Sequence, residues 1–144
     1  MESLDTIKLL KECDAGTKMA VESIDEVLEK VSDDGLKQLL QSSKAKHKEL
    51  ESEIEGLLAE HGASEKEPNA MAKGMSWMKT NMKLMMDESD ATIADLMTDG
   101  CNMGVKSLNE YLNQYKAADE VSKDIAKRLI NLEEKLAKDI REFL

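Results

Sequence analysis

The chain has 144 residues, of which 41% are hydrophobic and 35% charged, with only 3% aromatic and a single proline. This composition is typical of one domain of long helices with an aliphatic seam, and it leaves few residues for turns or strands. The formal net charge of −10 excludes nucleic acid and anionic membrane surfaces as partners, because both would be repelled.

Apolar residues spaced alternately three and four apart predict two long helices in the first part of the chain. The first covers about residues 3–31. The second begins at Ser32 or Asp33, whose side chains can cap a helix and complement its dipole. It ends at Gly62, since glycine is a natural helix terminator. The short turn between the helices predicts an antiparallel hairpin.

A long connection follows, from Gly62 to Ser89, and we expect one further helix within it, over about residues 71–86. A helix rises by about 1.5 Å per residue, and extended residues add more, so this connection can cross the full length of the bundle. Such a crossover would make the helices on either side of it parallel. An up-down-up-down bundle needs no connection of this length.

Two more amphipathic helices are predicted after the connection, over about residues 90–116 and from about residue 119 to the end. The short turn between them predicts a second antiparallel hairpin. The predicted seam of the last helix is aliphatic and consists of Val121, Ile125, Leu129, Leu132, Leu136, Ile140 and Phe143.

The second hairpin faintly repeats the first. Gly16, Met19, Val21, Ser23, Glu26 and Leu28 recur 84 residues later as Gly100, Met103, Val105, Ser107, Glu110 and Leu112. The repeat predicts an all-α four-helix bundle in a single domain, residues 1–144, with hairpins at about 3–62 and 90–144 and a crossover at about 63–89. The paired glycines predict a close approach of the first and third bundle helices, unless they are only a remnant of duplication.

Four short motifs lie along the chain: CDAG at 13–16 with Ala20, LLAEHG ending at Gly62, SWMKTNMK at 76–83 and DGCNMG at 99–104. Together with the doubled hairpin, these motifs resemble the ferritin-like superfamily. They are most similar to the small stand-alone ferritin-like bundles of bacteria whose function is uncharacterised. The resemblance covers nearly the whole chain and implies two related hairpins joined by one long crossover.

Ferritin-like proteins that do chemistry hold two irons, bound by a Glu from each of two helices and a Glu-x-x-His from each of the other two. That pattern is incomplete in this chain. The residue three before His47 is Lys44, and the residue three before His61 is Leu58. The position of the family's inward glutamate in the third helix holds Cys101. We therefore expect no di-iron centre.

Three polar residues are predicted inside the bundle: His47, Asp14 and Cys101. In one interpretation they are core residues with satisfied hydrogen bonds, and Thr98 is the partner of Asp14. In the other they form an atypical site for a single iron or other transition metal, although His47 and Asp14 stand about 10 Å apart along the bundle. Cys13 and Cys101 are expected to be buried, reduced thiols in a cytoplasmic protein.

Methionines and a tryptophan dominate one face of the predicted crossover helix: Met75, Trp77, Met78, Met82 and Met85. Three interpretations stay open, namely packing on the bundle, an interface that joins two chains about a two-fold axis, and copper(I) binding by methionine pairs. The interface is predicted because the apolar arc is broader than a narrow seam.

Two functional hypotheses follow. The first is a non-catalytic ferritin-like bundle without a cofactor that acts through self-association, as a homodimer, or through an unknown partner protein. The alternative is a metal-handling or redox protein with an atypical, incomplete metal site. The sequence leans away from an enzyme, since it has no glycine-rich phosphate loop and no serine–histidine–acid arrangement. It also lacks a membrane span and a signal peptide, so a cytoplasmic location is expected.

Overall fold

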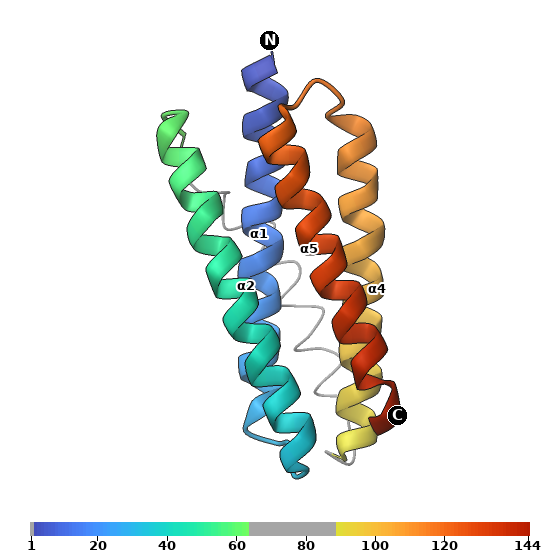
Figure 1. The fold of residues 1–144 in the computed structure, drawn as a ribbon. Helices are drawn as coiled ribbons and strands as arrows, with labels where there is room; N and C mark the ends of the chain where they lie inside the picture. The colour runs from blue at the N-terminus through green and yellow to red at the C-terminus, as the bar shows by residue number, and fades with distance from the viewer. Residues whose placement is uncertain (1, 64–88) are drawn as a thin grey trace.

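The protein is described by a computed structural model that covers residues 2–63 and 89–144 (Figure 1). The first hairpin consists of α1, Glu2–Leu28, and α2, Asp34–Glu60. The described residues contain helices and no strand, which confirms the predicted all-α class. The helix expected over residues 71–86, with all five predicted interface residues, lies outside the described residues.

The second pair of helices is α4, Asp90–Gln114, and α5, Glu120–Asp139, and α5 continues into the short 3-10 helix η1, Ile140–Phe143. Side-chain caps fix where these elements begin. Asp119 caps α5 by accepting a hydrogen bond from the Ser122 amide at 2.8 Å. The four long helices therefore lie close to the ranges that apolar spacing predicts.

The predicted ends of α2 are confirmed. Asp33 is its N-cap and accepts a hydrogen bond from the Leu36 amide at 3.0 Å. Gly62 follows the last turn with a φ of 68°, in the left-handed region that favours glycine. The Ala63 amide then donates to the Leu58 carbonyl at 2.8 Å, so a carbonyl that the helix would leave unpaired is satisfied.

Polar contacts at the two ends of the bundle fix the direction of the helices. The Asp90 carboxylate, at the start of α4, accepts hydrogen bonds from the amides of Ser32 and Asp33 just before α2, both at 2.9 Å. At the other end, Asp5 of α1 accepts a hydrogen bond from the Ala117 amide at 3.0 Å. The helices α2 and α4 therefore run in the same direction, and the end of α2 and the start of α4 lie at opposite ends (Figure 1).

Aliphatic side chains fill the bundle in two clusters. One lies toward the start of α1 and includes Leu9 and Leu129, and the other lies toward the end of α1 and includes Ile24, Leu40 and Ile93. Full burial of such a side chain stabilises the folded state by about 1.5–3 kcal/mol, so these clusters supply the main driving force for folding.

The predicted seam of α5 is wrong at Val121, which is 55% exposed. Leu132 and Phe143 are half-buried and pack against the two core clusters. Glu133, which was not predicted, is buried and faces the interior together with Leu129 and Leu136. Leu132 and Glu133 both fit a helical spacing between Leu129 and Leu136. Leu132 is the predicted seam residue because it is apolar, although the helix also turns Glu133 inward.

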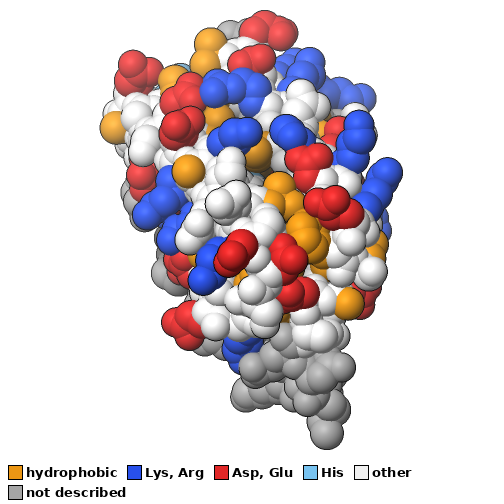
Figure 2. All heavy atoms as spheres, turned by 60° about the horizontal axis from the view of Figure 1, so that its bottom comes forward, with side chains coloured by type: hydrophobic (Ala, Val, Ile, Leu, Met, Phe, Trp, Pro, Cys, Tyr) orange, Lys and Arg blue, Asp and Glu red, His pale blue; other side chains and the backbone are white. Residues whose placement is uncertain are grey.

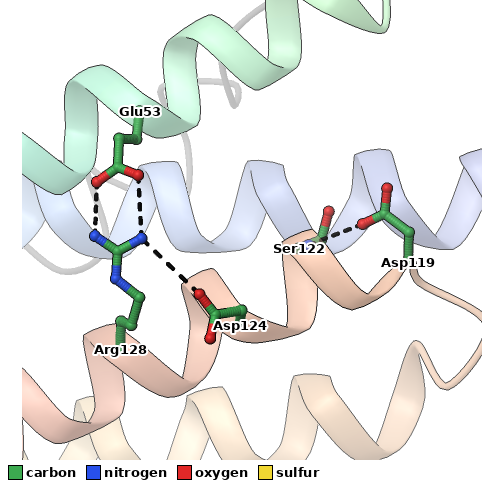
Figure 3. A network of polar contacts seen from close by, with 5 residues as sticks. All are labelled: Glu53, Asp119, Ser122, Asp124 and Arg128. Atoms are coloured by element: carbon green, nitrogen blue, oxygen red, sulfur yellow. Dashed lines mark hydrogen bonds and ion pairs between the residues drawn. The ribbon is translucent and has the colours of Figure 1, made fainter.

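The outer surface carries charged side chains of both signs, with apolar side chains visible between them on the face drawn in Figure 2. A bidentate ion pair links the exposed faces of α2 and α5 (Figure 3). Arg128 donates to the two carboxylate oxygens of Glu53 at 3.0 and 2.7 Å. None of the described helices is both long enough and apolar enough to span a membrane.

Candidate functional site

A cavity of about 200 Å³ lies between α1 and α4 and extends to α2 and α5. Its walls are mostly aliphatic, sulfur-containing or small residues, among them Ala15, Gly16, Met19, Ala20, Met97, Gly100, Cys101, Gly104 and Leu108. His47 of α2 and Glu133 of α5 also line it. A mostly apolar cavity with a few convergent polar groups is the usual form of a small-molecule site.

Glycines help to create this cavity. A Cβ atom placed at Gly100 would meet no atom of the described residues within 4 Å, and one at Gly16 would lie 3.7 Å from Leu129. The close helix approach predicted from these two glycines is therefore wrong at Gly100. Gly16 and Gly100 both line the cavity, and the missing side chain at Gly100 leaves part of its open space.

Glu133 is the most unusual residue of the cavity. It is only 7% exposed, and its carboxyl group forms no hydrogen bond with any described residue. Burial raises its pKa from 4.5 to about 8, so the carboxyl group holds a proton at neutral pH. Gly104 makes room for this group, since a Cβ there would lie 2.6 Å from Glu133 Oε2.

His47 is the second polar member, and its two ring nitrogens differ. Nδ1 lies 2.8 Å from the Ser43 carbonyl oxygen, which can only accept, so Nδ1 carries the proton and donates. Nε2 is buried and has no hydrogen-bond partner within the described part of the chain. Burial lowers the pKa of His47 below 6.5, so the ring is neutral and Nε2 presents a lone pair. The prediction of a satisfied core histidine thus holds for one nitrogen only.

The two polar groups face each other across a gap. His47 Nε2 lies 4.0 Å from Glu133 Oε1, which is too far for a direct hydrogen bond. Buried polar atoms normally have partners, and leaving one without a partner costs about 1–3 kcal/mol. A pair of buried polar groups that forms no hydrogen bond within residues 2–63 and 89–144 therefore marks a place where a bound group would be stabilised.

The three residues predicted as metal ligands separate into two places. Cys101 and His47 line the same cavity, but Asp14 is not part of its lining. The Asp14 carboxylate instead accepts a hydrogen bond from Lys18 Nζ at 2.7 Å. The expected bond between Asp14 and Thr98 is not formed, because the Thr98 hydroxyl donates to the Ala94 carbonyl at 2.8 Å.

A group of three carboxylates lies around Asp14. Ligand atoms of Asp14, Glu51 and Glu55 lie within 4.8 Å of one another at the contact of α1 and α2. The ammonium group of Lys18 is 2.7 Å from Asp14 Oδ2 and 3.4 Å from Glu55 Oε2. A positive charge of the chain itself therefore already offsets the repulsion between these acids.

Both cysteines are buried and free. Burial raises the pKa of the Cys13 thiol to about 12, and it raises the pKa of the Cys101 thiol even more. Both thiols are therefore protonated at neutral pH, which fits their predicted role as small core residues and makes them poor nucleophiles.

A family model described as a domain of unknown function (DUF2383) matches residues 5–114. The match contains nearly all of α1 and all of α2 and α4, whereas α5 with Glu133 lies beyond it. Because the match covers more than half of the chain, the protein belongs to the DUF2383 family. The comparisons with curated proteins and with solved structures give no match.

Proposed function

We propose that this member of the DUF2383 family is a non-catalytic binding protein that holds a partner molecule in the cavity between α1 and α4. The observation that carries the proposal is the apolar cavity bordered by His47 Nε2 and the Glu133 carboxyl group, neither of which forms a hydrogen bond with a described residue. The protonated thiols of Cys13 and Cys101 support binding over nucleophilic chemistry.

Filling the cavity tests this proposal. In Gly100→Leu the new side chain would enter the cavity, since a Cβ at this position lies more than 4 Å from every atom in residues 2–63 and 89–144. Gly56→Leu is the matched control, because it adds the same side chain at an exposed position of α2 that is equally open. Ligand-observed NMR with n-hexanol should detect binding to the unmodified protein and to Gly56→Leu but not to Gly100→Leu. Equal binding to all three proteins would place the binding site elsewhere.

We further propose that the bundle is ferritin-like, with two related hairpins and a crossover. The parallel directions of α2 and α4 and the long connection between them support this topology. A crystal structure of the full chain should place a helix over about residues 71–86 along the bundle. A structure with α2 and α4 antiparallel would exclude the ferritin-like topology. A cytoplasmic location remains part of the same proposal.

Self-association as a homodimer is proposed on the sequence pattern of the crossover. The surface consists of Met75, Trp77, Met78, Met82 and Met85. Polar substitutions at Trp77 and Met78 should convert a dimer into a folded monomer, as measured by analytical ultracentrifugation together with circular dichroism. An unmodified protein that is monomeric at high concentration would contradict this proposal.

Metal handling is the second candidate function, and one observation favours it. His47 Nε2, which has no hydrogen-bond partner among the described residues, and the Glu133 carboxyl group are both metal-ligand types, and Cys101 lines the same cavity. A single iron or other transition metal would take His47 and Glu133 as ligands. Metal analysis after equilibration with iron(II) or zinc should then give about one ion per chain and none for His47→Leu. Equal metal contents in the two proteins would exclude this site.

A further inference from the structure

We propose that the cavity between α1 and α4 binds a primary alkyl amine, with the ammonium group between Glu133 and His47 Nε2 and the hydrocarbon chain along the apolar walls. This inference rests on the proposed binding function of the cavity and names the class of ligand. It follows from the geometry of the polar pair, from the hydrogen-bonding character of the two groups and from the charges around the cavity.

The distance within the pair fits an ammonium group. Glu133 Oε1 and His47 Nε2 are 4.0 Å apart, so a nitrogen about 2.8 Å from both would bond to them at an angle of about 90°. This is close to the tetrahedral directions of N–H bonds. A transition metal about 2.1 Å from both atoms would need an angle of about 145°, which suits neither tetrahedral nor octahedral coordination. As it stands, the pair therefore matches the ammonium group better than the metal.

The hydrogen-bonding character of the pair also selects an ammonium group. Because Nδ1 of His47 donates to the Ser43 carbonyl, Nε2 can accept a hydrogen bond but cannot donate one. The Glu133 carboxylate likewise only accepts once its proton has passed to solvent or to a neutral amine. An ammonium group has three donors and no acceptor, so it satisfies both groups. A ligand carboxylate has no proton to donate, so it would leave His47 Nε2 without a hydrogen bond.

The remaining lining of the cavity agrees with a cationic amphiphile. Glu12 and Glu133 both line it, whereas none of its described lining residues is a lysine or arginine. The net charge of −10 attracts cations to the protein. Met19, Met97 and Leu108 offer apolar surface for an alkyl chain, and Gly100 leaves the space that the chain would occupy.

Calorimetric titration of the full chain with n-hexylamine, n-hexanol and hexanoate tests the inference. At about pH 7.5 the unmodified protein should bind n-hexylamine at least about tenfold more tightly than n-hexanol, and hexanoate most weakly. Glu133→Gln should remove this preference, because glutamine keeps the size of the side chain without its charge. Glu134→Gln, at the exposed neighbouring position, is the matched control and should bind like the unmodified protein.

The outcomes separate this inference from the proposed function. If n-hexanol and n-hexylamine bind equally and only Gly100→Leu abolishes binding, the cavity is a binding site but the amine inference is overturned. If no probe binds the unmodified protein, both fail. Gly104→Ala supplies a second test that keeps Glu133. The new Cβ would lie 2.6 Å from Glu133 Oε2 and would therefore displace the carboxyl group. It should also weaken n-hexylamine binding, and unchanged binding in both Glu133→Gln and Gly104→Ala would overturn the inference.

Discussion

Glu133 gives the bundle a defined dependence of stability on pH. Its pKa is about 8 in the folded state, against 4.5 for an unperturbed carboxyl group, because burial disfavours the charge. The folded state therefore holds a proton that the unfolded state releases. This contribution to stability is fully present below about pH 4.5 and is lost as the pH rises through about 8. The pKa of His47 is lowered in the folded state, so its contribution to stability depends on pH in the opposite direction. That contribution is present above the unfolded-state pKa and is lost as the pH falls through the folded-state pKa.

Urea unfolding at several pH values measures this effect. Between about pH 5 and 8 the free energy of unfolding should fall by on the order of 1 kcal/mol per pH unit through Glu133. Glu133→Gln should remove that part of the slope, whereas His47, Cys101 and Glu12, which line the same cavity, stay unchanged in the variant. Equal slopes for the two proteins would show that Glu133 is ionised in the folded state at neutral pH.

At the scale of the helix, two glycines of α4 one turn apart should respond oppositely to alanine. Gly100→Ala places a Cβ where the described part of the chain has no atom within 4 Å, so the higher helix propensity of alanine should stabilise the protein by about 1 kcal/mol. Gly104→Ala places a Cβ 2.6 Å from Glu133 Oε2, so this gain should be lost to displacement of the carboxyl group. Thermal unfolding followed by circular dichroism compares them, and equal changes in melting temperature would contradict the geometry of the cavity.

The helices and their ends could be predicted because they depend on local chemistry. The cap at Asp33 and the glycine at Gly62 act within one turn of the chain, and apolar spacing defines each helix independently of its neighbours. The cavity could not be predicted, since it depends on how far apart α1 and α4 lie. The burial of Glu133 could not be predicted, because both Leu132 and Glu133 fit a helical spacing of three or four residues between Leu129 and Leu136. The only signal in the sequence was an acidic residue at a position that fits this buried spacing.

At the scale of the whole molecule, Asp90 joins the two hairpins at one end of the bundle. Its carboxylate accepts hydrogen bonds from the amides of Ser32 and Asp33, both at 2.9 Å. Asp90→Ala should lower the free energy of unfolding by about 1–2 kcal/mol, because two amides lose a charged acceptor and α4 loses an acid in its first turn. Asp34→Ala is the control, since Asp34 is an exposed acid in the first turn of α2. If Asp90→Ala and Asp34→Ala lower the free energy of unfolding equally in chemical unfolding, Asp90 stabilises the protein only through its interaction with the helix dipole.

The central claim is that the cavity bordered by Glu133 and His47 is the binding site of this bundle. An NMR titration of isotope-labelled protein with n-hexylamine tests it most directly, because the shift of His47 Nε2 reports whether this nitrogen gains a hydrogen bond. We expect that shift to move, together with amide signals of lining residues in α1 and α4 such as Gly16 and Gly100. Unchanged His47 Nε2 and lining signals, or changes confined to the outer α2–α5 surface around Arg128, would contradict the account.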